Sequence, residues 1–264
     1  MTPPNLKASN LNDIPWLAHG FFGRKGGTST GEFESLNVSL KKGDLLENVM
    51  QNRQRMANAL SMENIPIVFA CQKHTNTVLV IDRPFGDDVP TADALVTHQK
   101  NLIIGIQTAD CVPVLFLDPF NKVIAAAHAG WKGLAGGILQ NTLVAMESLG
   151  ASRKHIKAAI GPCIWSESYE VGSDVHDAFP DSSDLFMHWR APTKANGMGI
   201  IKTFGFDLPM AAYRTLQIAG IADINPSPIN TYAHADDYFS YRRSTHLDEI
   251  RYGGQASLIG MPNI

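Results

Sequence analysis

Short apolar runs alternate with amphipathic segments along the chain, and this pattern predicts a mixture of strands and helices. Runs that are rich in valine and isoleucine and bounded by turn residues are typical of strands. Such runs occur at residues 65–71, 77–81, 102–107, 112–117, 123–127 and 156–160. Apolar residues at helical spacing predict three helices, at residues 44–60, 134–149 and 207–219.

Residues at the ends of these helices support the assignments. Asp44 is a candidate N-cap of the first helix, and Glu47 three residues later completes a capping box. Gly150 is suited to end the second helix, because glycine readily adopts the left-handed conformation that follows a helix. Asp207 is the predicted N-cap of the third helix, and Pro209 is tolerated in its first turn.

The strands predicted within residues 102–128 are joined by tight connections, which favours antiparallel pairing in a mixed sheet. The chain has no repeat, low-complexity block or linker, so its 264 residues are expected to form one domain. We therefore predict a single-domain α+β fold. Residues 180–204 have no clear period, and a lid, an edge hairpin and a loop all remain open for them.

The composition excludes several classes of protein. Hydrophobic residues make up 44% of the chain and charged residues 18%, which argues for a globular protein and against disorder. A formal net charge of −3 offers no electrostatic reason to expect nucleic acid or an anionic membrane as partner. No apolar run approaches the roughly 20 residues that span a bilayer. A small-molecule partner is therefore expected.

The expected cellular compartment indicates whether the three cysteines form disulfides. Residues 1–20 lack a basic segment followed by an apolar one, so we expect no export signal and a cytoplasmic location. Thiols stay reduced in the cytoplasm. Cys71, Cys111 and Cys163 are therefore expected to be buried thiols, ligands or nucleophiles rather than parts of disulfides.

Three residues at the ends of predicted strands form a candidate metal centre. Cys111 lies at a junction between two strands, His128 directly follows a strand and precedes a glycine-rich helix start, and His74 lies in a turn. Two imidazoles and a thiolate are three ligands for a tetrahedral ion with one open position, which is the arrangement of catalytic zinc sites. The soft thiolate disfavours magnesium and calcium. We expect zinc, with copper as the alternative ion.

Other functions remain open for the same residues. A metal-free cysteine hydrolase or amidase, acting for example on a cell-wall peptide bond, would use Cys111 as a nucleophile activated by His128 or His74. A binding or structural protein would hold zinc with a fourth protein ligand. A copper phenol oxidase suits one cysteine and two histidines, but a multicopper enzyme needs many more ligands. Asp110 is either an orienting or substrate-contacting carboxylate or an ordinary turn residue.

Ten short segments of the chain form a recognisable set of motifs. They are His19-Gly20-Phe21, Arg24-Lys25-Gly26-Gly27, Ser35-Leu36-Asn37, Asn52-Arg53, Gln72-Lys73-His74, Thr108-Ala109-Asp110-Cys111-Val112-Pro113, His128-Ala129-Gly130-Trp131, Gly161-Pro162-Cys163-Ile164, Tyr169-Glu170-Val171-Gly172 and Phe239-Ser240-Tyr241-Arg242-Arg243. These motifs resemble those of the YfiH-like laccase-domain family, also called polyphenol oxidases and now viewed as purine nucleoside phosphorylases. The resemblance runs from about residue 19 to the end, which divides the chain into an N-terminal extension, 1–18, and the family domain, 19–264.

The resemblance implies that His74, Cys111 and His128 correspond to the family's metal-binding residues. It also implies mixed β-sheets flanked by helices in a layered α/β/β/α fold, related to cysteine-hydrolase-like proteins. The implied activity is phosphorolysis of adenosine, inosine and 5′-methylthioadenosine to free base and sugar 1-phosphate, with adenosine deamination as a side activity. Two positions depart from the family's pattern: Thr75 replaces a glycine, and Asn230-Thr231 replaces a Cys-Thr pair.

Cleavage of a nucleoside requires groups that bind phosphate and the base. Arg24, beside two glycines, is the candidate phosphate ligand, because a guanidinium fork on a flexible loop suits phosphate oxygens; a solvated surface turn is the alternative. Asn37 and Gln72 are candidates for hydrogen bonds to the sugar or base. The expected partners are thus a nucleoside and phosphate, and we expect a monomer or a small homo-oligomer.

Overall fold

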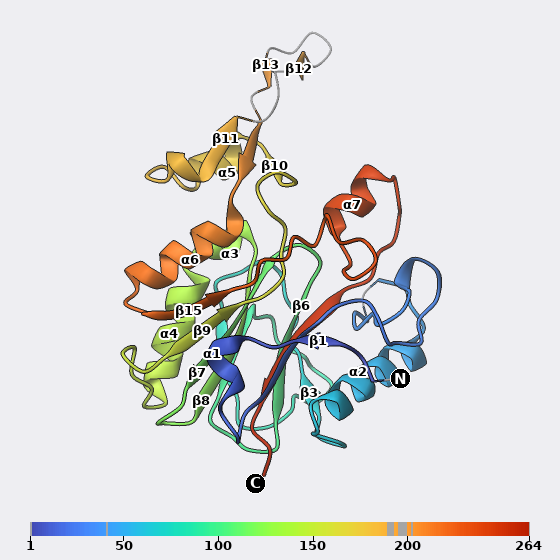
Figure 1. Cartoon of the computed structure of the whole chain (residues 1–264), viewed down its shortest axis with the longest axis vertical. Helices are drawn as coiled ribbons and strands as arrows, with labels where there is room; N and C mark the ends of the chain where they lie inside the picture. Colours follow the sequence, from blue (N-terminus) through green and yellow to red (C-terminus); the bar gives the residue numbers. More distant parts are fainter. Residues whose placement is uncertain (1, 41, 189–192, 195–199, 202, 264) are drawn as a thin grey trace.

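Two β-sheets pack face to face at the centre of the molecule (Figure 1). The structure is a computed structural model that describes residues 2–40, 42–188, 193–194, 200–201 and 203–263. The first sheet has the order β1 (Asn5–Leu6), β2 (Ala18–Phe22), β16 (Gln255–Gly260), β6 (Ile103–Thr108) and β3 (Ile67–Val68). The second has the order β15 (Asp223–Pro226), β9 (Lys157–Ile160), β7 (Val112–Asp118), β8 (Val123–Ala129), β5 (Ala94–Thr97) and β4 (Val78–Val80). Both sheets are mixed. The first has one parallel pair at an end, β3–β6, and the second has a parallel pair at each end, β9–β15 and β4–β5.

Alternating side chains divide the core into three layers. In β7, Val114 and Phe116 pack toward helices, whereas Leu115 and Leu117 pack toward the other sheet. Strands that are buried on both faces need apolar residues at nearly every position, which explains the continuous apolar runs in the sequence. In the first sheet, Ile259 of β16 faces the second sheet, whereas Ala256 and Leu258 of the same strand pack toward the helix that contains Met56.

Helices cover the outer faces of the two sheets. Figure 1 shows α4 (Ile138–Ser148) and α6 (Leu208–Ile218) on one side and α2 (Leu46–Ala59) on the other. The predicted arrangement of mixed sheets flanked by helices, layered α/β/β/α, is therefore confirmed. The remaining elements are α1 (Ser9–Asn12), α3 (Trp131–Ala135), α5 (Ser173–Asp177), α7 (Tyr241–His246), 3-10 turns at Gly31–Phe33 and Ser183–Leu185, β10 (Glu170–Val171), β11 (Phe186–His188), β12 (Thr193–Lys194), β13 (Ile200–Ile201) and β14 (Phe204–Phe206).

The ends of the predicted helices were partly wrong. The N-cap of α2 is Leu45, and no side chain caps it. The carboxylate of Asp44 instead accepts hydrogen bonds from Ser29 Oγ at 2.6 Å and Asn37 Nδ2 at 2.9 Å, so the predicted capping box does not form. The expected N-cap Asp207 is confirmed, since its side chain accepts from the backbone N–H of Met210 at 2.9 Å.

The helix predicted at residues 134–149 corresponds to the end of α3 and the whole of α4, because the chain turns between these two helices. Gly137 at this turn has a φ of 88°, a left-handed conformation that glycine adopts without strain. The start of the second helix was therefore misplaced, and the short α3 begins directly after the strand that carries His128.

Strands β6 and β7 are neighbours in sequence but lie in different sheets, which corrects the expected pairing. β7 and β8 pair antiparallel as predicted, whereas β6 pairs with β16 and β3. The chain crosses between the sheets at residues 109–111, where Asp110 has a φ of 93°. This crossing places Cys111 where the ends of the two sheets meet.

Two further segments bear on the sequence predictions. Residues 5–12, inside the predicted N-terminal extension, form β1 and α1, and Leu11 is fully buried. The division at residue 18 stays a prediction. Within residues 180–204, β11 pairs with β14 and β12 pairs with β13; residues 189–192, 195–199 and 202 lie outside the described part. Over the described residues, no helix has the length and apolar character that crossing a membrane requires.

Candidate metal centre

His74, Cys111 and His128 converge at one end of the two sheets. One ligand atom from each side chain lies within 4.8 Å of the other two. His128 is the penultimate residue of β8, Cys111 follows the crossing from β6, and His74 lies in the loop between β3 and β4. The two imidazole rings meet edge to face with centroids 4.8 Å apart. Among the described residues, this is the one group of three such side chains close enough to share a metal ion.

Gly130 allows the backbone to approach this group. A Cβ atom at position 130 would lie 2.5 Å from His74 Nδ1 and 3.2 Å from Cys111 Sγ. The first distance is shorter than real Cβ contacts, so any larger residue would displace the histidine. The donor set and this close fit are compatible with a tetrahedral ion that prefers nitrogen and sulfur ligands, such as zinc.

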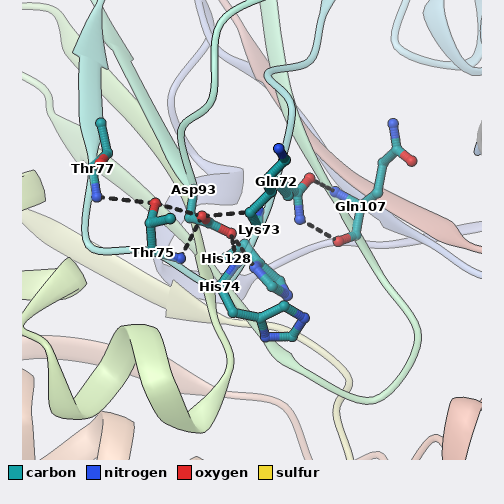
Figure 2. Close-up of polar contacts among 8 residues, drawn as sticks. All are labelled: Gln72, Lys73, His74, Thr75, Thr77, Asp93, Gln107 and His128. Carbon is teal, nitrogen blue, oxygen red and sulfur yellow. Dashed lines mark hydrogen bonds and ion pairs between the residues drawn. The ribbon is translucent and has the colours of Figure 1, made fainter.

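Asp93, immediately before β5, connects two of the three residues (Figure 2). Its side chain is fully buried, and Oδ1 lies 2.8 Å from His128 Nδ1. The same carboxylate accepts backbone N–H groups from Lys73 at 3.2 Å, His74 at 3.0 Å and Thr75 at 2.7 Å, and the Thr75 hydroxyl at 2.7 Å. This network holds the His74 loop and directs Nε2 of His128 away from Asp93.

The network also accounts for the backbone conformation at His74. His74 has a φ of 58°, in the left-handed region that a non-glycine residue adopts only when its surroundings enforce it. Three successive N–H groups directed at one carboxylate supply that constraint.

The charges of Cys111, His128 and Asp93 shift one another's pKa. Burial raises the pKa of the Cys111 thiol, but the charge of His128 and hydrogen bonds from both histidines outweigh burial and lower it to about 6. Burial lowers the pKa of His128, whereas the Cys111 charge and the Asp93 hydrogen bond raise it to about 9. Burial raises the pKa of Asp93, but hydrogen bonds from His128 and Thr75 bring it well below its usual range. Both shifts favour a thiolate on Cys111 beside an imidazolium on His128 when no ion is bound.

Asp110 anchors the Cys111 loop to the C-terminal part of the chain. Its buried carboxylate accepts hydrogen bonds from Thr231 Oγ1 at 2.7 Å, Ser240 Oγ at 2.8 Å and the backbone N–H of Arg242 at 2.7 Å. Burial raises its pKa, and these hydrogen bonds oppose that rise. Asp110 therefore positions Cys111 through the backbone, and its carboxylate oxygens bond to the C-terminal segment rather than to a histidine.

A cavity of about 720 Å³ opens onto the three converging residues. This volume is in the range of small-molecule sites, which are commonly about 300–1,000 Å³. Aromatic rings of Phe69, Tyr241 and Tyr252 contribute to its wall, and Lys42 and Arg53 are also lining residues. The cavity thus offers aromatic faces and positive charge beside the candidate metal centre.

The substrate-binding residues expected from the sequence are not all in this cavity. Gln72 lines it, and its side-chain amide is clamped by two hydrogen bonds of 2.7 Å with the backbone of Gln107 (Figure 2). Asn37 lies outside the lining; it is fully buried, and its amide bonds to Ser39, Asp44 and Gly254.

Arg24 lines a separate cavity of about 270 Å³. Its guanidinium donates to backbone carbonyls at Glu34 (2.7 Å) and Ala235 (3.2 Å) and lies over the ring of Phe239. The structure therefore gathers His74, Cys111, His128 and Gln72 around one cavity and leaves Arg24 and Asn37 outside its lining.

Sequence reasoning missed Asp93, Lys42 and Arg53. Asp93 directly precedes the apolar segment 94–97, which is a strand that the sequence analysis did not predict. A carboxylate at the start of that strand was the available signal. Arg53 belongs to a matched motif, but nothing in the sequence relates it to the distant Cys111. Lys42 lies in a loop that carries no motif.

Comparison with known proteins identifies relatives along the whole chain. A family model described as multi-copper polyphenol oxidoreductase laccase matches residues 18–262. A purine nucleoside phosphorylase of Streptomyces coelicolor is 36% identical over 225 residues, covering 85% of this chain and 89% of the relative. A purine nucleoside phosphorylase of Deinococcus radiodurans is 36% identical over 265 residues, covering 98% and 93%.

Solved structures agree with this relationship. A Neisseria meningitidis protein superposes with a TM-score of 0.81 at 32% identity and covers 98% of this chain and 99% of its own. The YfiH protein of Bacillus licheniformis superposes with a TM-score of 0.83 at 28% identity and covers 94% of both chains. The chain therefore belongs to the multi-copper polyphenol oxidoreductase laccase family, which includes the YfiH-like proteins.

Proposed function

We propose that this protein is a zinc-dependent purine nucleoside phosphorylase. It converts adenosine, inosine or 5′-methylthioadenosine and phosphate to the free base and the sugar 1-phosphate, and it deaminates adenosine as a side activity. The observation that carries the proposal is the convergence of His74, Cys111 and His128 on a cavity large enough for a nucleoside. The names of the two bacterial relatives support the choice of reaction.

The three converging residues would hold the ion. When bound, zinc supplies positive charge that stabilises developing negative charge and acidifies water. Copper is the alternative ion for the same donors. A multicopper oxidase is disfavoured, because the described residues provide one such group of three.

The surrounding residues bind and orient the substrate in this proposal. The rings of Tyr241, Tyr252 and Phe69 offer apolar faces against which a purine can stack. Gln72, immobilised by Gln107, is the proposed polar contact to sugar or base. Asp93 keeps the two histidine ligands in place, since it binds both.

The test is a base-release assay on purified, zinc-loaded protein. Adenosine, inosine and 5′-methylthioadenosine are incubated with and without phosphate, and free base is separated chromatographically. We expect phosphate-dependent release of base that is lost in His74→Ala and Cys111→Ser. His98→Ala, which changes an exposed histidine outside the cavity lining, is the matched control and should retain activity. No release of base from any of the three nucleosides would refute the proposal.

A second candidate is a metal-free cysteine hydrolase or amidase. The hydrogen-bonded series Cys111, His128 and Asp93 favours it, because a thiolate, an imidazolium and an orienting carboxylate also form a nucleophilic site. The test is hydrolysis of an amide, such as a cell-wall peptide bond, in excess chelator. Hydrolysis that continues without metal and is abolished by Cys111→Ser would favour the hydrolase. Activity that requires added zinc would exclude it.

A further inference from the structure

The charged residues that line the main cavity are unbalanced. Lys42, in the loop before α2, and Arg53, on α2, both line it, and no aspartate or glutamate does. Both side chains are half-buried. None of the ion pairs among the described residues joins either cation to a carboxylate. Half-buried cations without a paired carboxylate favour an anionic ligand.

Lys42 lies close to the candidate metal centre. Its Nζ is 2.8 Å from the ring centroid of Tyr252, which lines the same cavity. Burial lowers the pKa of Lys42 to about 7, while the charges of Cys111 and Asp110 act to raise it. Lys42 and the three converging residues line the same cavity, so an anion at Lys42 would share that cavity with them. Tyr241, the first residue of α7, also lines this cavity.

Arg53 is held in the same cavity wall, and part of its guanidinium is left to donate hydrogen bonds to a ligand. Its Nε and Nη2 donate to Val38 O at 3.2 and 2.8 Å, and its guanidinium lies 4.7 Å from the ring centroid of Phe69. Nη1 makes no hydrogen bond to any described residue. A guanidinium held by packing and two hydrogen bonds loses little freedom when it binds an oxyanion.

The smaller cavity is less suited to an anion. Arg24 and Arg243 line it together with Glu32 and Glu249, so its two cations are accompanied by two carboxylates. The guanidinium groups of Arg24 and Arg243 also donate to backbone carbonyls. The charge balance therefore favours the main cavity over the one that contains Arg24.

We propose that Lys42 and Arg53 form an anion subsite that binds inorganic phosphate beside His74, Cys111 and His128. The identity of the anion as phosphate rests on the proposed function, whereas the preference for an oxyanion follows from the charges of the cavity. Lys42 in its protonated form supplies a compact charge, and a bound anion favours that form; Arg53 supplies directed N–H donors.

Titration calorimetry with inorganic phosphate tests this assignment on zinc-loaded protein at constant ionic strength. We expect Lys42→Met and Arg53→Gln each to raise the Kd for phosphate by about tenfold or more, since each removes a charged hydrogen-bond donor. Lys42→Arg, which restores the charge, should recover most of the affinity. Lys100→Met removes the same charge from an exposed turn outside the cavity lining and should leave the Kd unchanged.

Several outcomes would overturn the assignment. It fails if the wild-type protein binds no phosphate, if Lys42→Met and Arg53→Gln both bind phosphate like the wild type, or if only Arg24→Gln weakens binding. Because Arg53 also packs on Phe69, thermal unfolding of each variant without phosphate separates loss of the subsite from loss of the fold. Phosphate binding that depends on Lys42 without release of base supports the subsite and refutes the proposed reaction. Phosphate-dependent release of base, with Kd values for phosphate in Lys42→Met and Arg53→Gln equal to that of the wild type, supports the proposed reaction and refutes the subsite.

Discussion

Replacement of Asp93 by asparagine tests the claim that one buried carboxylate organises the candidate metal centre. The change keeps the shape of the side chain but replaces one acceptor oxygen by an NH2 donor. In one orientation this NH2 faces the N–H of His74 and the ring of His128; in the other it faces the N–H groups of Lys73 and Thr75. Either orientation deprives two hydrogen-bond donors of their acceptor at the buried Asp93 side chain.

The magnitude follows from these lost contacts. A buried polar group without a partner costs about 1–3 kcal/mol, so the free energy of unfolding of the metal-free protein should fall by about 2–5 kcal/mol. His128 also loses the carboxylate that orients its ring at the candidate metal centre. Loss of such a partner typically weakens metal binding about 10–100-fold, so we expect zinc affinity to fall by a comparable factor.

Two measurements and one control variant decide the matter. Urea unfolding gives stability, and competition with a chromophoric chelator gives zinc affinity. Asp118→Asn is the matched control, because Asp118 is also fully buried and accepts four hydrogen bonds, but it is the last residue of β7 and lies outside the cavity lining. It should lose stability and keep its zinc affinity. If Asp93→Asn also keeps wild-type zinc affinity, the organising role of Asp93 is refuted.

Three further predictions follow. Gly130→Ala should lower zinc affinity at least about tenfold, since its Cβ displaces a histidine ligand, whereas Gly86→Ala, which meets no atom within 4 Å, should not; equal affinities would contradict the close fit. In metal-free protein the Cys111 pKa is lowered to about 6, so its alkylation rate, followed by peptide mass spectrometry, should stay high at neutral pH and fall only as the pH drops through about 6. The same measurement on His128→Ala should move the midpoint upward, and a wild-type midpoint near 9 would disprove the thiolate assignment. Asp207→Ala should lower the urea unfolding free energy by about 1 kcal/mol through loss of its cap; an unchanged value would show that the cap contributes nothing.

The local part of this structure could be predicted from the sequence. Apolar runs predicted β6, β7, β8 and β9 within one or two residues, because strands buried on both faces need apolar side chains at nearly every position. Asp207 was identifiable as an N-cap because the hydrogen bond it makes spans three residues. The family was recognisable because its motifs are short contiguous segments.

Contacts between distant segments account for what the sequence left open. Asp44 satisfies the conditions of a capping residue locally, yet its carboxylate bonds to Ser29 and Asn37 instead. Likewise, β6 and β7 have the pattern of a paired hairpin, but β6 bonds to β16, about 150 residues further along the chain. Local propensity is weak compared with burial of a whole sheet, so tertiary packing decides such cases.

The candidate metal centre shows the same division. The sequence by itself determined which residues carry metal-binding chemistry, His74, Cys111 and His128, and that each ends a strand or lies in a turn. Only the tertiary structure brought their ligand atoms within 4.8 Å and placed Asp93 behind two of them. It also left Arg24 outside the main cavity and put Lys42 and Arg53 in its wall. The sequence contains the type of each side chain and the local periodicity, whereas the proximity and burial of the site residues arise only when the two sheets pack together.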